Sequence, residues 1–333
     1  MRLGRYLETH LPGFRGLHAV EDFADGQSNP TSRLVADSGI YVLRRKPPGD
    51  LLKSAHAVDR EFRVLSALAH SDVPVARALH LCEDEAVLGS VFYVMEFVAG
   101  RVFWDPSLPG LDPGERAAIY DQMNKALATI HTVDVHAVGL ADYGRPGSYF
   151  ERQFATWSRQ YRASETGAIP AMERIIDWLG ANMMADDGRV SLVHGDYRLD
   201  NVMFAPDAPR LIAVMDWELS TLGHPLADLA YQCMLWRMPP GPVLGGLEGV
   251  DRAALGLPSE AEYVARYCAR AGVPGIKDWE FYLVFGLFRL AAIVQGVRFR
   301  GLQGNASSDR ALQVGALAEP LARKACDILD GRG

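Results

Sequence analysis

The chain has 333 residues, of which 49% are hydrophobic and 23% charged. This composition supports a full core and excludes a disordered or collagen-like chain. The net charge of −7 lacks the basic footprint of a nucleic-acid-binding protein. The N-terminus has no apolar core of a signal peptide, and the longest apolar stretch, 281–297, is interrupted by Arg289 and falls short of a membrane span. The four cysteines lie far apart, so we expect a soluble, cytoplasmic protein with reduced thiols and no membrane or nucleic-acid partner.

The first hundred residues alternate between strand-like and helix-like patterns. Residues 34–36 and 39–44 are predicted strands separated by a short turn. Apolar residues then recur at helical spacing, which predicts a helix over 54–70 with Ser54 as its N-cap. Residues 91–98 form a predicted buried strand, which leads into a hinge at about 96–100.

The rest of the chain is predicted to be mostly helical. Asp112 precedes Pro113 and Glu115, a combination typical of a helix start, and apolar spacing continues this helix to His131. Further helices are expected around 150–161 and 175–183, from 226 onward, and over 259–271, 278–299 and 309–329, with short strands at 192–193, 202–204 and 211–215. We therefore predict an α+β protein with a small N-terminal lobe, 1–98, and a larger C-terminal lobe, 99–333.

The stretch 192–218 carries the pattern most suggestive of chemistry. Asp196 follows His194 and Gly195, Asn201 comes five positions later, and Asp216 ends an apolar strand. Such a set suits phosphoryl transfer: one carboxylate orients a hydroxyl, while a second carboxylate and an amide hold Mg²⁺ against phosphates. Asp and Asn are also common in turns, so the alternative is a set of turn residues, and Asp200 and Asp207 are interpreted in that way.

Three segments between residues 194 and 231, HGDYRLDNVMF, MDWE and GHPLADLAY, resemble the aminoglycoside phosphotransferase family of the protein-kinase-like superfamily. LRRKPPG, SAHAVDREFRVL and YVMEFVAGR resemble its branch associated with acyl-CoA dehydrogenases. The similarity covers roughly 20–325. It implies a two-lobed kinase fold, with a small lobe of antiparallel sheet and one long helix, and ATP or GTP bound in the cleft.

The resemblance assigns roles to the residues of the larger lobe. Asp196, in the catalytic loop 194–201, matches the catalytic Asp. Asn201 and Asp216, the latter in the segment 216–218, match the metal-ligating pair. Asp228 matches a residue that braces the catalytic loop, with an exposed helix residue as the alternative. We interpret His194 as a support of the loop through a hydrogen bond rather than as a base.

The small lobe departs from the family pattern. The strand position that carries a phosphate-binding lysine in the superfamily is Arg44 here, and Glu61 matches its partner glutamate. Arginine binds phosphate oxygens bidentately and stays charged, so the substitution is compatible with nucleotide binding. The alternatives are that Lys46 takes this role, or that Arg44 and Glu61 are surface residues.

Two further small-lobe segments match nucleotide-binding positions of the superfamily. The loop 25–29 corresponds to the phosphate-covering loop, with Gly26 giving backbone freedom and Ser28 and Asn29 offering hydrogen bonds. It is not a GxGxxG sequence, and the chain has no P-loop motif. Backbone groups near Glu96 and Val98 are expected to pair with the adenine edge.

The acceptor is the least determined part of the sequence interpretation. Acidic and basic residues are equal in number from Trp217 to the end, unlike a trap for polycations. Arg289 and Arg298 lie in or after an apolar helix and are candidate clamps for a substrate carboxylate or phosphate, whereas a salt bridge to a protein acid is the alternative for Arg289. The aromatic residues at helical spacing over 150–161 form either core or an acyl pocket.

These observations favour an ATP-dependent phosphotransferase that acts on a hydroxyl of a small molecule. The resemblance to the acyl-CoA-dehydrogenase-associated branch suggests a hydroxy acid or hydroxyacyl-CoA rather than an aminoglycoside. The alternative is a catalytically silent nucleotide-binding or regulatory protein on the same scaffold. The sequence does not fix ATP against GTP or the oligomeric state.

Overall fold

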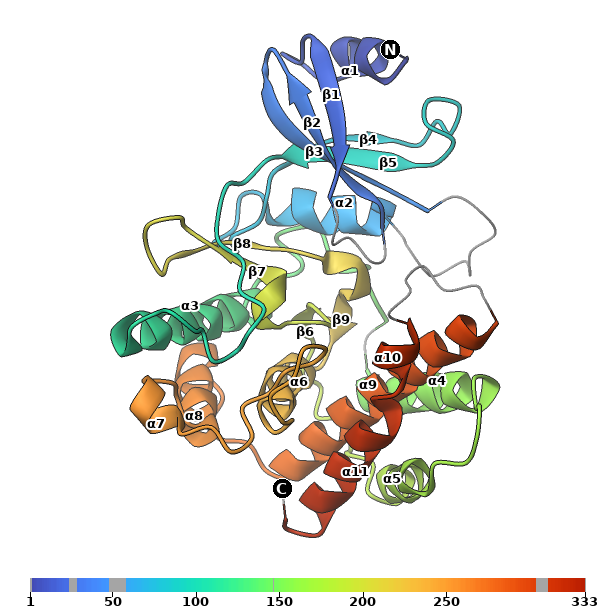
Figure 1. The fold of residues 1–333 in the computed structure, drawn as a ribbon, viewed down its shortest axis with the longest axis vertical. Helices are drawn as coiled ribbons and strands as arrows, with labels where there is room; N and C mark the ends of the chain where they lie inside the picture. Colours follow the sequence, from blue (N-terminus) through green and yellow to red (C-terminus); the bar gives the residue numbers. More distant parts are fainter. Residues whose placement is uncertain (1, 24–28, 48–57, 146, 304–310, 333) are drawn as a thin grey trace.

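The computed structural model describes residues 2–23, 29–47, 58–145, 147–303 and 311–332. A small lobe with a five-stranded sheet lies above a larger, mainly helical lobe (Figure 1). The protein is therefore α+β with two lobes, as the sequence predicts.

The small lobe is an antiparallel sheet with one helix on each face. The strand order is β1-β2-β3-β5-β4, and the elements are α1 (Arg2–His10), β1 (Leu17–Asp22), β2 (Thr31–Ala36), β3 (Gly39–Arg45), α2 (Val58–Leu68), β4 (Ala78–Cys82) and β5 (Phe92–Glu96). Alternate residues of β5 enter different cores, since Phe92 and Val94 pack with α1 and Tyr93 packs with α2. This is the two-residue period of a strand buried on both faces.

The predicted small-lobe elements are present with shifted ends. The two predicted strands extend to Thr31–Ala36 and Gly39–Arg45, and the third shortens to Phe92–Glu96. The predicted helix is observed over Val58–Leu68, and its proposed cap, Ser54, lies outside the described residues.

A short connection joins the two lobes. The chain leaves the sheet after Glu96, and the next residue to pair is Arg101, whose N–H donates to the Phe204 carbonyl at 2.7 Å while the Phe204 N–H returns a bond of 2.9 Å. A Cβ on Gly100 would lie 2.4 Å from Cγ of Met203, so this close approach requires glycine. The lobe boundary at residue 98 stays a prediction.

The larger lobe combines helices with two small antiparallel sheets of two strands each. One sheet pairs β6 (Ser191–Val193) with β9 (Thr221–Gly223), and the other pairs β7 (Val202–Phe204) with β8 (Leu211–Val214). The helices are α3 (Pro113–His131), α4 (Tyr149–Ala163), α5 (Pro170–Ala181), α6 (Leu226–Trp236), α7 (Arg252–Leu255), α8 (Glu260–Ala271), α9 (Trp279–Leu302), α10 (Ala311–Gly315) and α11 (Ala318–Leu329). Asp112 caps α3 as predicted, with its side chain accepting from the Glu115 N–H at 2.9 Å.

Helix α9 is the central helix of this lobe. Its 24 residues are long and apolar enough to cross a membrane by length and composition, although the sequence interpretation judged the stretch too short. However, 78% of its most apolar window is buried inside the protein, where it packs against α4, α6 and α11. Phe150 of α4 meets Phe281 and Phe285 edge to face. Of the aromatic residues at helical spacing over 150–161, the buried members Phe150 and Tyr161 thus belong to the core.

Candidate active site

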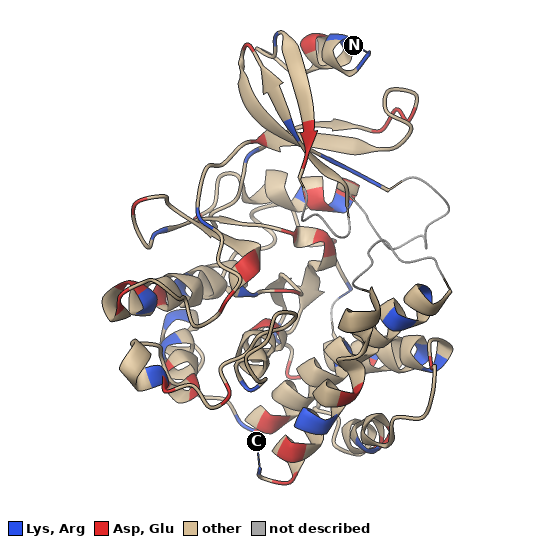
Figure 2. Ribbon diagram, in the orientation of Figure 1, with Lys and Arg blue, Asp and Glu red and all other residues tan. Residues whose placement is uncertain are grey.

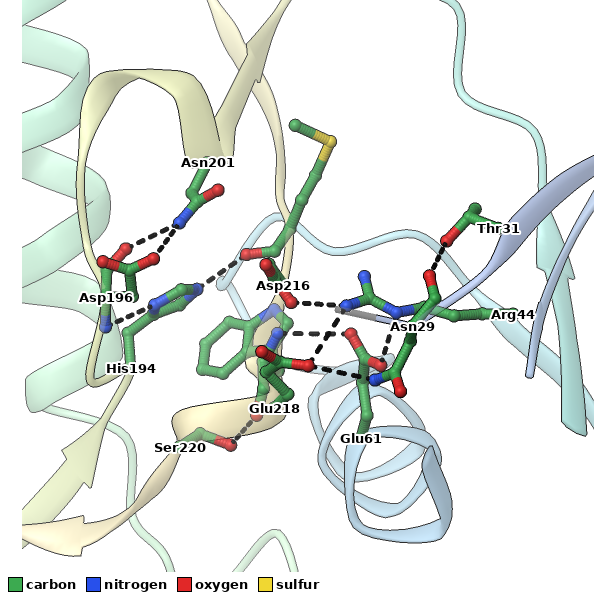
Figure 3. Close-up of polar contacts among 12 residues, drawn as sticks. Asn29, Thr31, Arg44, Glu61, His194, Asp196, Asn201, Asp216, Glu218 and Ser220 are labelled. Atoms are coloured by element: carbon green, nitrogen blue, oxygen red, sulfur yellow. Dashed lines mark hydrogen bonds and ion pairs between the residues drawn. The ribbon is translucent and has the colours of Figure 1, made fainter. Parts of the chain in front are cut away.

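The two small sheets bring the predicted catalytic loop and metal ligands together. The loop after β6 carries Asp196 and ends in a short 3₁₀ turn, Leu199–Asn201, while Asp216 follows β8 (Figure 3). The amide nitrogen of Asn201 donates to both the backbone carbonyl and the carboxylate of Asp196, each at 2.9 Å. The Met215 N–H donates to the Asn201 carbonyl at 2.8 Å, which fixes Asp216 beside this pair.

The donor set at this point fits Mg²⁺. Because its amide nitrogen bonds Asp196, Asn201 has its amide oxygen available, and Asp216 adds a carboxylate. Among the described residues there is no group of three or more His, Cys, Asp and Glu able to hold a metal. Mg²⁺ is commonly held by one or two protein oxygens together with substrate phosphates, so the ion is expected with a nucleotide rather than alone.

His194 supports the loop with both of its ring nitrogens. Nε2 lies 2.7 Å from the Met215 carbonyl, and Nδ1 accepts from the Asp196 N–H at 3.2 Å. This network assigns a neutral ring that donates through Nε2. Both ring nitrogens are thus engaged within the loop, and the supporting role of His194 stays a prediction.

Asp228, in the first turn of α6, holds the backbone of the same loop. Its carboxylate accepts from the N–H groups of His194 and Gly195 at 2.5 and 2.9 Å and lies 3.3 Å from Nε2 of His131. Burial raises the pKa of Asp228, but the contact with His131 and these hydrogen bonds outweigh it, so its pKa is lowered overall. Gly195 has φ +85°, and a Cβ there would lie 2.6 Å from the Leu219 carbonyl oxygen. The brace therefore acts on a backbone that only glycine accommodates.

Arg44 lies among three carboxylates on the nucleotide side of the site. Its Nε is 3.1 Å from Glu61, and one terminal nitrogen is 2.5 Å from Asp216 and 3.6 Å from Glu218 (Figure 3). Burial lowers the pKa of Arg44, yet Glu61 and Asp216 raise it by more, so Arg44 stays a cation. Burial also raises the pKa of Glu61 despite Arg44. The structure thus places Arg44, rather than Lys46, beside Glu61.

Asp216 adopts a backbone conformation that is rare for its type. Its φ and ψ are 60° and 61°, in the left-handed region. A non-glycine residue there costs about 1–3 kcal/mol and persists only where its surroundings impose it. The Met215 N–H bond on one side and the Trp217 N–H, which donates to Glu61 at 3.3 Å, on the other impose it here. Such strain is concentrated at functional sites.

The remaining nucleotide-side predictions are placed as follows. Asn29 is buried and donates through its amide nitrogen to Glu218 at 3.0 Å, whereas Gly26 and Ser28 lie outside the described residues. The N–H of Glu96 donates to the Arg77 carbonyl at 3.0 Å. Within the described ranges, the backbone N–H and carbonyl of Val98 make no hydrogen bond to the protein, which leaves them available to a ligand.

Arg198 is a part of the site that the sequence interpretation missed. Its guanidinium lies 3.5 Å from the Asp196 carboxylate and 3.0 Å from Asp200. The interpretation of Asp200 as a solvated turn residue was wrong, because its side chain is only 14% exposed and ion-paired. The signal available in the sequence was a basic residue two positions after Asp196.

Arg289 approaches the catalytic loop from α9. One terminal nitrogen donates to the Gly195 carbonyl at 2.7 Å, and the residue is 7% exposed. The alternative of a salt bridge was wrong for the described residues: none of their acids lies within ion-pair distance of Arg289. Arg298 is exposed nine positions further along α9, on the opposite side of the helix. The structure therefore does not bring the two arginines together.

Comparison with curated proteins gives relatives that contain a similar segment. The chain is 48% identical to acyl-CoA dehydrogenase family member 10 of Mus musculus over 98% of its own length and 31% of the relative. It is 44% identical to acyl-CoA dehydrogenase family member 11 of Rattus norvegicus over 96% of its own length and 42% of the relative. The chain thus spans less than half of the length of these relatives.

Solved structures show a similar fold. A proposed aminoglycoside phosphotransferase from Ralstonia eutropha is 51% identical, with a TM-score of 0.90 over 99% of this chain and 98% of that one. A spectinomycin phosphotransferase solved with ADP and spectinomycin is 13% identical, with a TM-score of 0.65 over 98% of each chain, and shows the fold alone. Residues 19–282 match the phosphotransferase enzyme family. The chain therefore belongs to the phosphotransferase enzyme family and has its kinase-like fold.

Proposed function

We propose that this protein transfers the γ-phosphoryl group of ATP, or of GTP, to a hydroxyl of a small molecule. The observation that carries the proposal is the convergence of Asp196, Asn201 and Asp216 beside the two small sheets, linked by hydrogen bonds of 2.9 Å and by the Met215 backbone. A carboxylate with an adjacent pair of oxygen donors is the arrangement that phosphoryl transfer to an alcohol requires.

The reaction is proposed to be a direct displacement. Asp196 orients the acceptor hydroxyl and takes its proton while the hydroxyl oxygen bonds to the γ-phosphorus and the bond to the ADP oxygen breaks. Asn201 and Asp216 would hold Mg²⁺, which when bound neutralises charge on the phosphate oxygens. Arg198 lies 3.5 Å from the Asp196 carboxylate, close enough for its positive charge also to neutralise charge on the phosphate oxygens. Catalysis then rests on positioning and electrostatic stabilisation.

The nucleotide is proposed to lie between the lobes, beneath the sheet. Arg44 holds phosphate oxygens and keeps its contact with Glu61, and Asn29, with Gly26 and Ser28 of the same loop, covers the phosphates. Backbone groups at Glu96 and Val98 pair with the base. The absence of any hydrogen bond from the Val98 backbone to the described part of the chain supports this placement. We place the reaction in the cytoplasm.

The acceptor is proposed to be a hydroxy acid or a hydroxyacyl-CoA. Curated relatives that contain this segment are named as acyl-CoA dehydrogenase family members, so a substrate related to acyl metabolism is the natural choice. Acidic and basic residues are interspersed over both lobes in Figure 2, which does not suggest a trap for a polycation.

Thermal unfolding with AMP-PNP tests the nucleotide–metal site. A ligand that binds only the native state stabilises it by about 2.7 kcal/mol at roughly 100 times its Kd. We expect stabilisation of the wild type that depends on Mg²⁺ and is lost in Asp216→Ala. Asp207→Ala is the matched control, because Asp207 is exposed in the β7–β8 turn. Equal stabilisation of Asp216→Ala and wild type would contradict the proposed metal site.

A silent scaffold is the second candidate. The observation in its favour is the 2.5 Å contact between Arg44 and Asp216, which gives the proposed metal ligand a counter-ion within the protein. Under this function, nucleotide analogues bind without Mg²⁺ or not at all, and no acceptor is phosphorylated. ADP release that requires an acceptor and is abolished in Asp196→Ala would exclude it.

A further inference from the structure

Arg289 is a buried cation whose partners in the protein leave its charge unmatched. It lies in a run of α9 that is otherwise almost wholly apolar and buried, and only 7% of the residue is exposed. Transfer of a charge from water to such a position costs several kcal/mol unless an opposite charge and hydrogen bonds compensate. Its one hydrogen bond to the described protein goes to the neutral carbonyl of Gly195, at 2.7 Å.

The acids near the loop are engaged elsewhere. The Asp228 carboxylate accepts from the N–H groups of His194 and Gly195 and also contacts the ring of His131. Asp196 accepts from Asn201 and lies beside Arg198. The Nε atom of Arg289 is buried and has no hydrogen-bond partner among the described residues. A buried donor of this kind is uncommon in folded proteins and calls for an explanation.

The surroundings of Arg289 place this unmet donor at the acceptor side of the site. Its guanidinium carbon lies 5.6 Å from the ring centres of both Trp157 and Tyr231. The Tyr231 side chain also lies beside the Asp196 carboxylate, and burial together with Asp196 raises the pKa of its hydroxyl well above the ordinary value. The guanidinium thus lies one peptide away from Asp196 and 5.6 Å from the centres of two aromatic rings.

We infer that Arg289 binds an acyl oxygen of the acceptor, either of a carboxylate or of its thioester. The inference rests on the proposed function for the position of the acceptor hydroxyl at Asp196. A carboxylate supplies both the missing charge and the missing hydrogen-bond acceptor, and charge-assisted bonds of this type are the strong ones. A thioester carbonyl supplies a hydrogen-bond acceptor without a charge, as the Gly195 carbonyl does. A polycationic acceptor meets a like charge here.

Equilibrium binding to the full chain with AMP-PNP and Mg²⁺ tests this inference. The probes are 2-, 3- and 4-hydroxybutyrate, the corresponding CoA thioesters, and the butanediols of the same hydroxyl position, which lack the acyl oxygen. Arg289→Met removes the charge and keeps the length, Arg289→Lys keeps the charge, and Arg300→Met is the control, because Arg300 is exposed on the same helix. Retained stabilisation by AMP-PNP shows that each variant is folded.

We expect the wild type to bind an acyl probe more tightly than its diol. Arg289→Met should weaken that binding by about 10- to 100-fold, with Arg289→Lys intermediate and the diol unchanged. A larger effect on the carboxylate than on the thioester, or the reverse, identifies the source of the acyl oxygen. Arg300→Met should behave as wild type.

Two results would overturn the inference. One is that no acyl probe binds more tightly than its diol. The other is that Arg289→Met slows phosphorylation of acyl and diol probes equally with unchanged affinities, since Arg289 then only positions Gly195. Arg289-dependent binding without phosphorylation of any probe would instead contradict the proposed reaction and leave the inference standing.

Discussion

Arg44 and Arg289 lie in opposite electrostatic surroundings. Arg44 is surrounded by Glu61, Asp216 and Glu218 within 3.6 Å, so its charge is already balanced. Arg289 has a backbone carbonyl and two aromatic rings. Under the proposed function, a nucleotide at Arg44 would replace existing ion pairs, whereas an acceptor at Arg289 would add a missing one. The two halves of the reaction should respond differently when their arginines are changed.

The largest expected effect is on Asp196, which lies between the two sides. Asp196→Asn removes the proton acceptor and keeps the size of the side chain. We expect turnover to fall about 1,000-fold, near 4 kcal/mol, with AMP-PNP and acceptor binding retained. Turnover is measured as acceptor-dependent ADP release. Loss of nucleotide binding in this variant would show that Asp196 belongs to the nucleotide side instead.

The next effect tests the balance of charge around Arg44. Arg44→Met leaves Glu61 buried without its cation, so we expect a loss of about 3 kcal/mol in the free energy of unfolding. The double variant Arg44→Met with Glu61→Gln should recover much of this loss, because the uncompensated carboxylate is gone. Chemical denaturation measures both. If the single variant unfolds like the wild type, the cluster contributes no net ion-pair energy.

Asp228 should give an effect of about 2 kcal/mol that depends on pH. The two carboxylate oxygens of Asp228 accept from two N–H groups of the loop, whereas asparagine has one accepting oxygen and one donating NH₂ group. Asp228→Asn therefore loses one charged hydrogen bond to the loop. The folded-state pKa of Asp228 is lowered. Its contribution is therefore fully present above the ordinary Asp value of about 4 and is lost as the pH falls through the lowered one.

Unfolding measured between neutral and acid pH compares the two proteins. The difference in stability between wild type and Asp228→Asn should shrink as the solution is acidified. A difference that stays constant down to the acid limit would contradict the lowered pKa of Asp228.

The smallest effect sharpens the acceptor side. Tyr231→Phe keeps the ring near Arg289 and removes the hydroxyl beside Asp196. We expect about 1 kcal/mol, or a fivefold loss in kcat/KM, with acyl binding through Arg289 preserved. Steady-state kinetics separate an effect on turnover from an effect on acyl binding. A loss confined to KM for acyl probes would place Tyr231 in binding rather than in support of Asp196.

The parts of the site that the sequence predicted are those coded by neighbours in the chain. His194, Asp196 and Asn201 lie in one loop, and their mutual contacts follow from spacing. Partners supplied by distant segments were harder to predict. The acceptor of Arg289 is a carbonyl 94 positions away, and no side-chain pattern marks a backbone group. Asp200 looked solvated because its burial depends on tertiary packing.

The same distinction holds for the fold. Long periodic segments such as α3 and α9 were predicted close to their observed ends. Short elements were missed: β1 has mainly exposed residues, which gives little hydrophobic alternation, and α1 has only three buried residues. The predicted helix over 309–329 is interrupted after Gly315, and α11 begins at Ala318.

The anchoring of the interlobe connection restricts how the cleft can open. Downstream of residue 99, the chain is fixed to β7 by Gly100 and by the bonds of Arg101 to Phe204. A second backbone link joins the lobes where the Val214 N–H donates to the Pro74 carbonyl at 2.8 Å. Helix α2 ties the lobes as well, since the Tyr143 hydroxyl donates to the Arg60 carbonyl at 3.2 Å and Arg63 pairs with Asp142. The lobes are therefore joined by several links at once, and moving Arg44 away from Asp216 would disturb the contacts of α2 as well as the connection near residue 100.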